Sequence, residues 1–358
     1  MSVFGDIVGH RDIIRSLESS LAGGGLSHAY LFHGPEGVGK RTVARRFAAV
    51  LVSKGEPSRR ALAGLHPDVV EVEPEGAFTT IGQAREVVRL AASRPLEGVR
   101  RVFILRADTL NVQAANALLK TLEQPEGESV FLLLAISRES VLETIASRAR
   151  SLRFSPVPVP EVEELLKRRG VERAGLWAAL GRGSVGLALR YAEEPGFREM
   201  REAVFEAGLS FPEDFEGLHE AVERIAARAE EVGAAEEAAF LARAGEWEES
   251  GRRVKEGARR ARRAGRDRAA AEALELLALV YRDLAAVAAG VPELIANTDR
   301  REELEQAVER YPGADWAGAA RVAAECRGQL TYNVTLEAVL EVALLRILRQ
   351  TRASSPAW

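Results

Sequence analysis

A glycine-rich segment, GPEGVGK, has the spacing of a phosphate-binding loop, with Gly34, Gly39 and Lys40 at its defining positions and Gly37 between them. The glycines allow backbone N–H groups to turn toward phosphate oxygens, and the lysine ammonium can reach the outer phosphates. An apolar run at 29–33 precedes the loop and a helical pattern follows it, so a helix N-terminus would face the phosphates. The alternative is a glycine-rich strand-to-helix turn with an exposed lysine.

The position after the lysine argues against a magnesium ion at this loop. A phosphate loop normally continues with Ser or Thr, whose hydroxyl binds magnesium, but here the residue is Arg41. Thr42 comes one step later and lies about 100° further round the helix. We keep Thr42 as a candidate for residual phosphate contact and predict no metal ligand among these residues.

The end of a second apolar run, 101–105, lacks the carboxylates that ATP hydrolysis requires. In a P-loop ATPase, acidic residues at this place hold the metal ion and the attacking water. Here the tip reads Leu105-Arg106, and Asp108 follows too late in the chain. Two interpretations remain: the chain has lost hydrolysis, or it is an active ATPase with unconventional ligands such as Asp108 and Thr42.

The elements that would position these residues alternate between strands and helices. Apolar runs predict strands, and stretches with helical spacing separate them. The predicted strands lie at 29–33, 68–74, 101–105 and 129–135, and the helices after the loop and over 81–92 and 111–124. This alternation predicts an α/β domain with a parallel sheet covered on both faces.

The pattern changes after this region. Residues 151–160 contain three prolines and predict a linker. Residues 161–195 read as short helices, and from about 205 onward the chain is rich in Ala, Glu, Arg and Leu with helical periodicity. A separate all-helical domain is therefore predicted there.

Composition narrows the class of protein. The chain has 358 residues, 47% of them hydrophobic, but no apolar run long enough for a membrane span, and its start does not resemble a signal peptide. The single cysteine, Cys326, excludes internal disulfides and suits a reducing cytoplasm. The net charge of −4 is too small for a protein that coats DNA.

One basic segment, 251–268, follows an acidic stretch at 213–249. It would form either a DNA- or partner-binding face or a solvated helix that pairs with the acidic stretch. The nearness of the opposite charges favours pairing.

Four segments together resemble the clamp-loader subunits of bacterial DNA polymerase III, which are AAA+ proteins, and the delta-prime type best. The segments are HAYLFHGPEGVGK (28–40), HPDVVEV (66–72), NALLKTLEQP (116–125) and TIASRAR (144–150). The resemblance is dense over 4–155. It implies an AAA+ P-loop domain at 1–155, a helical lid at 156–204 and a helical collar at 205–358. In that family, five subunits form a ring that opens the sliding clamp and places it on primed DNA.

The resemblance assigns roles to single positions. Where motor subunits carry the Walker B Asp-Glu pair, this chain has Leu105-Arg106, and Ala135-Ile136 replace the polar sensor-1 residue. Leu187 stands where a lid arginine would sense the γ-phosphate. Ser147 and Arg148 match the Ser-Arg-Cys motif, whose arginine acts on the nucleotide of the neighbouring subunit.

These assignments imply a stator that does not hydrolyse ATP and supplies Arg148 as an arginine finger in trans. The implied partners are the gamma/tau motor subunits, the delta subunit, the sliding clamp and primed DNA, with no membrane. No cofactor is required, although Gly34, Gly37, Gly39, Lys40 and Thr42 could hold residual nucleotide or phosphate. A scaffold protein on a relic AAA+ domain is a further alternative.

Two smaller expectations complete the interpretation. Many relatives carry a four-cysteine zinc module where this chain has a short cysteine-free segment, 53–65, so no zinc is expected and His66 becomes a turn or packing residue. Arg85 and Arg89 share one helix face that could track a DNA backbone, or could simply be solvated.

Overall fold

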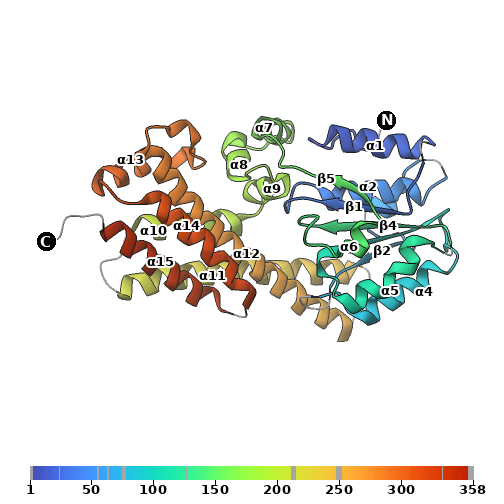
Figure 1. Ribbon diagram of the computed structural model, residues 1–358. Helices are drawn as coiled ribbons and strands as arrows, with labels where there is room; N and C mark the ends of the chain where they lie inside the picture. Colours follow the sequence, from blue (N-terminus) through green and yellow to red (C-terminus); the bar gives the residue numbers. More distant parts are fainter. Residues whose placement is uncertain are drawn as a thin grey trace. The chain divides into compact units, whose positions relative to one another are not determined.

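The computed structural model describes residues 3–23, 25–54, 56–62, 64–74, 78–125, 127–210, 215–246, 252–332 and 334–353. The chain forms two compact units (Figure 1). Unit 1 consists of Met1–Val171 and Gly181–Ala188, and unit 2 consists of Glu172–Leu180 and Leu189–Trp358. The boundary therefore runs through the segment expected to form a lid, and the division into three domains stays a prediction.

Unit 1 is built on a five-stranded parallel sheet with the order β2-β3-β4-β1-β5. The strands are β1 (Ala29–His33), β2 (Val69–Val72), β3 (Arg101–Arg106), β4 (Ser129–Ala135) and β5 (Arg150–Arg153). The helices of this unit include α1 (Arg11–Leu21), α2 (Lys40–Leu51), α3 (Arg59–Leu62), α4 (Ile81–Ala91), α5 (Val112–Glu123), α6 (Glu143–Ala146) and α7 (Val159–Arg168). The predicted α/β fold with a parallel sheet is confirmed.

Both faces of the sheet are covered, because alternate strand residues point to opposite sides. Tyr30 and Phe32 of β1 pack with α1 and α2, whereas Leu31 packs with α4, α5 and α6. The continuous apolar runs of β1, β3 and β4 follow from this burial on both faces.

Strand β5 differs from the sequence-based expectation. The sequence predicts that residues 151–153 belong to the proline-rich linker, but they lie in β5, which pairs with β1 in the register Tyr30↔Arg150 to His33↔Arg153. β5 has no apolar run, and most of its residues are exposed. Its position depends on pairing with β1, which the local sequence does not reveal.

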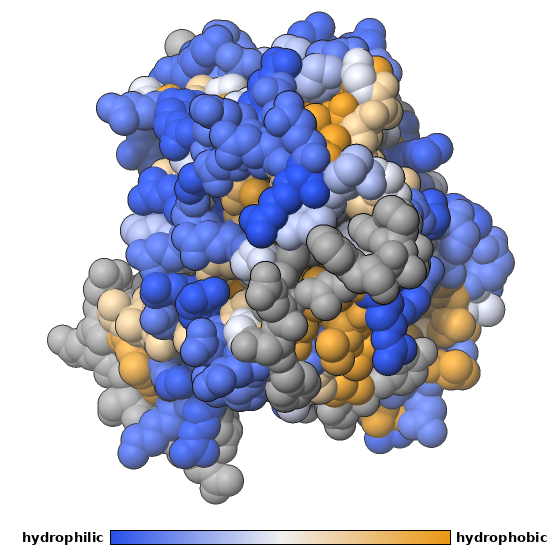
Figure 2. Space-filling view, turned by 90° about the vertical axis from the view of Figure 1, so that its left-hand side faces the viewer, coloured by the Kyte–Doolittle hydropathy of each residue, from blue (hydrophilic) through white to orange (hydrophobic). Residues whose placement is uncertain are grey.

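Unit 2 is helical in the part of it that the structure describes. Its main helices are α8 (Ala174–Leu180), α10 (Pro195–Ser210), α11 (Phe215–Glu246), α12 (Arg252–Ala288), α13 (Arg301–Arg310), α14 (Trp316–Arg327) and α15 (Leu336–Ala353), and α9 (Val185–Glu193) spans the boundary between the units. α15 exposes Val342 and Leu345, and the face of the molecule seen in Figure 2 has apolar areas within a mostly hydrophilic surface. Among the described residues, no helix is both long and apolar enough to cross a bilayer.

The basic segment lies in the first half of α12 and pairs with α11. Arg266 contacts Glu230 at 3.2 Å, Arg268 contacts Glu236 at 2.6 Å, and Arg262 also reaches Glu230, at 3.4 Å. These ion pairs confirm the interpretation that the segment pairs with the acidic stretch. The exposed pairs contribute little stability individually, and their main effect is to balance charge between two long helices.

Candidate functional site at the two edges of the sheet

The phosphate loop lies at the carboxyl edge of the sheet, directly after β1. Because the strands are parallel, the ends of β1, β3 and β4 meet at this edge. The N–H of Gly34 donates to the carbonyl of Ala135 at 3.2 Å, which ties the loop to the end of β4. Gly34 has φ +146°, and a Cβ there would lie 2.0 Å from the carbonyl oxygen of Phe154, so only glycine fits.

Gly37 contacts residues 184–187, which follow about 150 positions later in the chain. Its φ is +73°, and a Cβ there would lie 1.9 Å from Ser184 Oγ. The N–H of Gly186 donates to the carbonyl of Gly37 at 3.0 Å, and Ser184 Oγ accepts from the N–H of Leu187 at 3.1 Å. The loop is therefore packed against the residues that would carry a phosphate sensor, and Leu187 offers no charge there.

The ammonium group of Lys40 is hydrogen-bonded to carbonyls of its own loop. Its Nζ donates to the carbonyls of Gly34 and Pro35, at 2.5 and 2.6 Å, and burial lowers the pKa of its ammonium. An ammonium has three N–H donors, so these two hydrogen bonds leave one donor for a further acceptor such as a phosphate oxygen. The neighbouring Arg41 pairs with Glu73 at 2.5 Å, and Thr42 is exposed.

The end of β3 is neutralised by an internal ion pair. Arg106 donates from Nε and Nη2 to the two oxygens of Asp108, at 3.1 and 3.0 Å, and these hydrogen bonds raise the pKa of Arg106. The N–H of Ile136 also donates to Asp108, at 3.1 Å, and Leu105 is buried. Both oxygens of the nearest carboxylate are thus already in use.

A magnesium ion does not fit these residues. Mg²⁺ requires oxygen ligands in near-octahedral geometry. Arg41 and Arg106 place positive charge at two positions where such ligands would lie. The side chain of Leu105 has no oxygen atom that could bind the ion. The alternative of an unconventional site at Asp108 and Thr42 would first require Asp108 to separate from Arg106.

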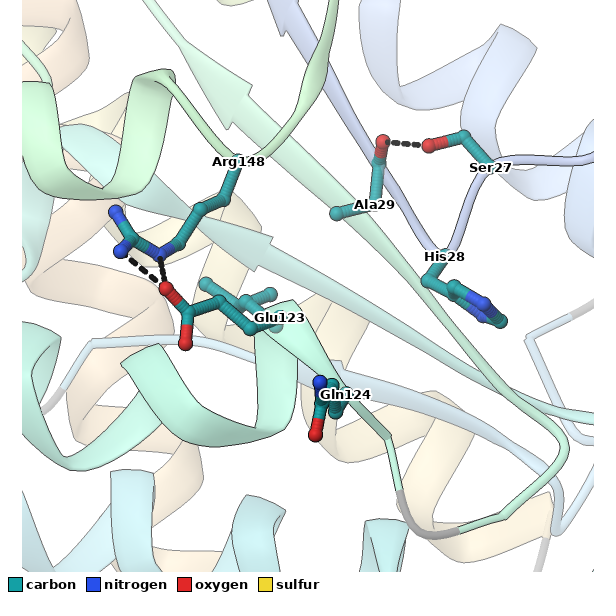
Figure 3. A pocket seen from close by; sticks show the side chains of 7 residues that line it. Ser27, His28, Ala29, Glu123, Gln124 and Arg148 are labelled. Carbon is teal, nitrogen blue, oxygen red and sulfur yellow. Dashed lines mark hydrogen bonds and ion pairs between the residues drawn. The ribbon is translucent and has the colours of Figure 1, made fainter.

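Arg148 lies at the opposite, amino edge of the sheet, between α6 and the start of β5. Its Nε donates to Glu123 Oε1 at 2.6 Å, its Nη2 also pairs with Glu123, and its Nη1 donates to the carbonyl of Thr144 at 2.8 Å. Figure 3 shows Arg148 and Glu123 reaching toward one another. The Arg148 side chain is 32% exposed, and the neighbouring Ser147 is exposed as well.

An open pocket of about 440 Å³ adjoins this pair. Its lining comprises Ser27, His28, Ala29, Leu122, Glu123, Gln124 and Arg148. Ala29 is the first residue of β1, whereas Gly34 follows its last, so β1 separates the pocket from the phosphate loop. A five-residue strand spans roughly 16 Å, which is longer than a side chain can reach. Arg148 therefore cannot serve the phosphate loop of its own sheet.

A buried ion pair fixes the strands that connect these edges. Asp68 and Arg101 are completely or almost completely buried, with Arg101 Nη2 at 2.9 Å from Asp68 Oδ1. Burial opposes the charge of Asp68, but hydrogen bonds from the N–H groups of Glu97, Gly98 and Leu96 outweigh it and lower its pKa to about 2. The motif HPDVVEV thus carries a structural carboxylate.

Three further expectations have mixed outcomes. His66 accepts a hydrogen bond from the N–H of Asp68 at 3.1 Å, which confirms a role in a turn. The described residues contain no cluster of three or more His, Cys, Asp or Glu side chains suited to a metal, and the absence of zinc stays a prediction. Arg89 pairs with Glu86 at 2.8 Å, while Arg85 is exposed, and DNA contact by this helix also stays a prediction.

Sequence reasoning missed the partners of the predicted residues. Glu123, Ser184 and Glu73 each contact a predicted residue, but they lie 25 or more positions away from it. Glu123 lies in the motif NALLKTLEQP. Only its position at the end of a predicted helix could have indicated a contact with a cation such as Arg148.

Fold and site together define the class: an α/β domain with a parallel sheet, a phosphate-loop motif at the carboxyl edge of that sheet and an arginine at the opposite edge. Residues 9–158 match the family model described as DNA polymerase III, delta subunit. Over 135 residues the chain is 40% identical to DNA polymerase III subunit delta' of Pseudomonas aeruginosa, covering 34% of this chain and 41% of that protein.

Two further relatives are also DNA polymerase III subunits, one of the delta' type and one of the gamma/tau type. The chain is 31% identical over 169 residues to subunit delta' of Bacillus subtilis, covering 44% and 51% of the two proteins. It is 32% identical over 178 residues to subunit gamma/tau of Mycobacterium bovis, covering 46% and 31%. The chain thus spans about half or less of the length of these relatives. Over this part of the chain, the resemblance to DNA polymerase III delta-prime is confirmed.

Proposed function

We propose that this protein is a clamp-loader subunit of the delta-prime type, which does not hydrolyse ATP and supplies Arg148 to the nucleotide of a neighbouring motor subunit. The observation that carries this proposal is the placement of Arg148 on the edge of the sheet opposite the phosphate loop. An arginine that cannot reach its own loop can act on a nucleotide only when that nucleotide belongs to another chain.

The carboxyl edge supports the other half of the proposal. Hydrolysis requires a metal to neutralise phosphate charge and a carboxylate to position water. Leu105 is apolar and Asp108 is held by Arg106, so neither of these two positions offers a free carboxylate for these tasks. Arg41 stands where a hydroxyl would bind magnesium, so we expect any nucleotide held at the loop to bind without dependence on magnesium.

The partners follow from the same proposal. The neighbouring subunit would be of the gamma/tau type, with a delta subunit, the sliding clamp and primed DNA completing the assembly in the cytoplasm. Unit 2 would supply the collar contacts, and the exposed Val342 and Leu345 of α15 suit burial against another helix.

The test is a turnover assay with and without this chain. The isolated protein should release no phosphate from Mg-ATP. When it is added to gamma/tau and delta subunits with clamp and primed DNA, turnover should rise, and Arg148→Ala should remove most of that rise.

Arg138→Ala is the matched control, because Arg138 is also exposed and paired with a glutamate, Glu143 at 2.8 Å. It should leave the stimulation unchanged. Magnesium-dependent turnover by the isolated chain would favour the unconventional ATPase instead. Failure to assemble with the motor subunits would favour a scaffold protein.

A further inference from the structure

We propose that Glu123 is the positioning residue for Arg148: it holds the guanidinium at the amino edge so that an N–H faces outward toward an anion. This inference rests on the proposed function of Arg148, and it assigns a role to a residue outside the Ser-Arg motif. Glu123 does not itself touch the nucleotide.

The geometry of the pair is that of an oriented guanidinium. An arginine has five N–H donors in one plane. Nε and Nη2 both engage Glu123, and Nη1 engages the carbonyl of Thr144, so the plane is fixed from α5 on one side and from α6 on the other. One N–H of Nη2 has no hydrogen-bond partner among the described residues and remains for an incoming anion.

The place of Glu123 on its helix also points to this role. Glu123 is the last residue of α5, where the helix dipole disfavours negative charge and favours a cation. Leu118 and Leu122 are buried against the sheet and fix the register of the helix, so Glu123 projects at its rim. The acidic side chain becomes favourable at this position because Arg148 lies beside it.

The ion pair between Glu123 and Arg148 is partly exposed to solvent and is held by two nitrogens of the guanidinium. The Glu123 side chain is 48% exposed, and an exposed ion pair contributes little to folding stability. Its effect should therefore appear in catalysis, since a misplaced catalytic group loses rate steeply with distance. The adjoining open pocket leaves room for the partner to approach.

The experiment measures ATP turnover of the assembled complex containing this chain as wild type, Glu123→Ala, Glu123→Gln, Arg148→Ala or the double variant. Glu123→Ala should lower kcat about tenfold with KM for ATP changed less than about twofold, because the finger is misplaced but nucleotide binding is intact. Glu123→Gln keeps an acceptor oxygen and should recover turnover to within about threefold of wild type. In the Arg148→Ala background, Glu123→Ala should cause no further loss.

Glu143→Ala serves as the matched control, since Glu143 is also an exposed glutamate of a helix end paired with an arginine. It should behave as wild type, and all variants should keep the thermal midpoint of the parent. If Arg148→Ala lowers turnover but Glu123→Ala does not, or raises it, the inference fails and the finger stands. A further loss in the double variant would also overturn it. If Arg148→Ala has no effect, the proposed function itself fails.

Discussion

The two edges of the sheet in unit 1 differ in what surrounds their positively charged side chains. At the carboxyl edge, Lys40, Arg41 and Arg106 are all paired with groups of the same unit, and the residues there do not fit a magnesium ion. At the amino edge, Arg148 is also paired, and it lies beside an open pocket. Among the described residues, one N–H of its Nη2 has no hydrogen-bond partner. This difference supports the proposal that the domain does not hydrolyse ATP itself and supplies Arg148 to a neighbouring subunit.

The comparison depends on a rigid sheet that keeps the two edges apart. Removing one partner of the buried Asp68–Arg101 pair should have the largest effect on the stability of that sheet. Asp68→Asn leaves the guanidinium of Arg101 buried without its counter-charge, which should lower the free energy of unfolding by about 3–5 kcal/mol. Denaturant unfolding at neutral pH measures this. Asp12→Asn, at an exposed ion pair, should change it by less than about 1 kcal/mol. Equal effects of the two substitutions would refute a structural role for Asp68.

Disrupting the contact between the phosphate loop and residues 184–187 should cause the next largest loss of unfolding free energy. Gly37→Ala adds a Cβ at positive φ and against Ser184 Oγ, so we expect a loss of about 2–3 kcal/mol in unfolding free energy. Gly170→Ala has nearly the same φ, +72°, with open space around it, and should cost only about 1 kcal/mol. No difference between these variants in a denaturant titration would mean that the loop is not packed as described.

The pKa of Asp68 gives a pH dependence of similar size. A folded-state pKa of about 2, below the ordinary 3.8, means that this stabilisation is complete above about pH 4 and is lost as the pH falls toward 2. The difference corresponds to about 2 kcal/mol. Unfolding free energies measured between pH 5 and 2 should decline more steeply in the wild type than in Asp68→Asn. Parallel curves would exclude Asp68 as the source.

Restoring a hydroxyl at the carboxyl edge should have the smallest effect. Arg41→Ser supplies the missing magnesium ligand, but Leu105 and Arg106 still lack the carboxylates, so the isolated chain should remain without measurable ATPase activity. Phosphate release from Mg-ATP checks this, with Arg41→Ala as control. Turnover in the serine variant alone would mean that the site lacks only a hydroxyl.

Sequence reasoning reached the parts of the molecule that local patterns encode. The apolar runs predicted β1, β3 and β4, and glycine spacing identified a loop whose Gly34 and Gly37 both have positive φ. β5 escaped because RSLR has no apolar run, and its pairing with β1 is a long-range contact. The motif identified Arg148, but its partner Glu123 lies 25 residues away, and no local pattern records such a contact.

The most direct test of the central claim compares the two edges in one measurement. Pre-steady-state phosphate release is followed in the assembled complex carrying this chain as wild type, Lys40→Ala or Arg148→Ala. We expect Lys40→Ala to match wild type and Arg148→Ala to lose the rapid phase of the site it serves, since an arginine finger is worth roughly 10³–10⁵ in rate. The reverse pattern, with the phase lost in Lys40→Ala and kept in Arg148→Ala, would contradict the account.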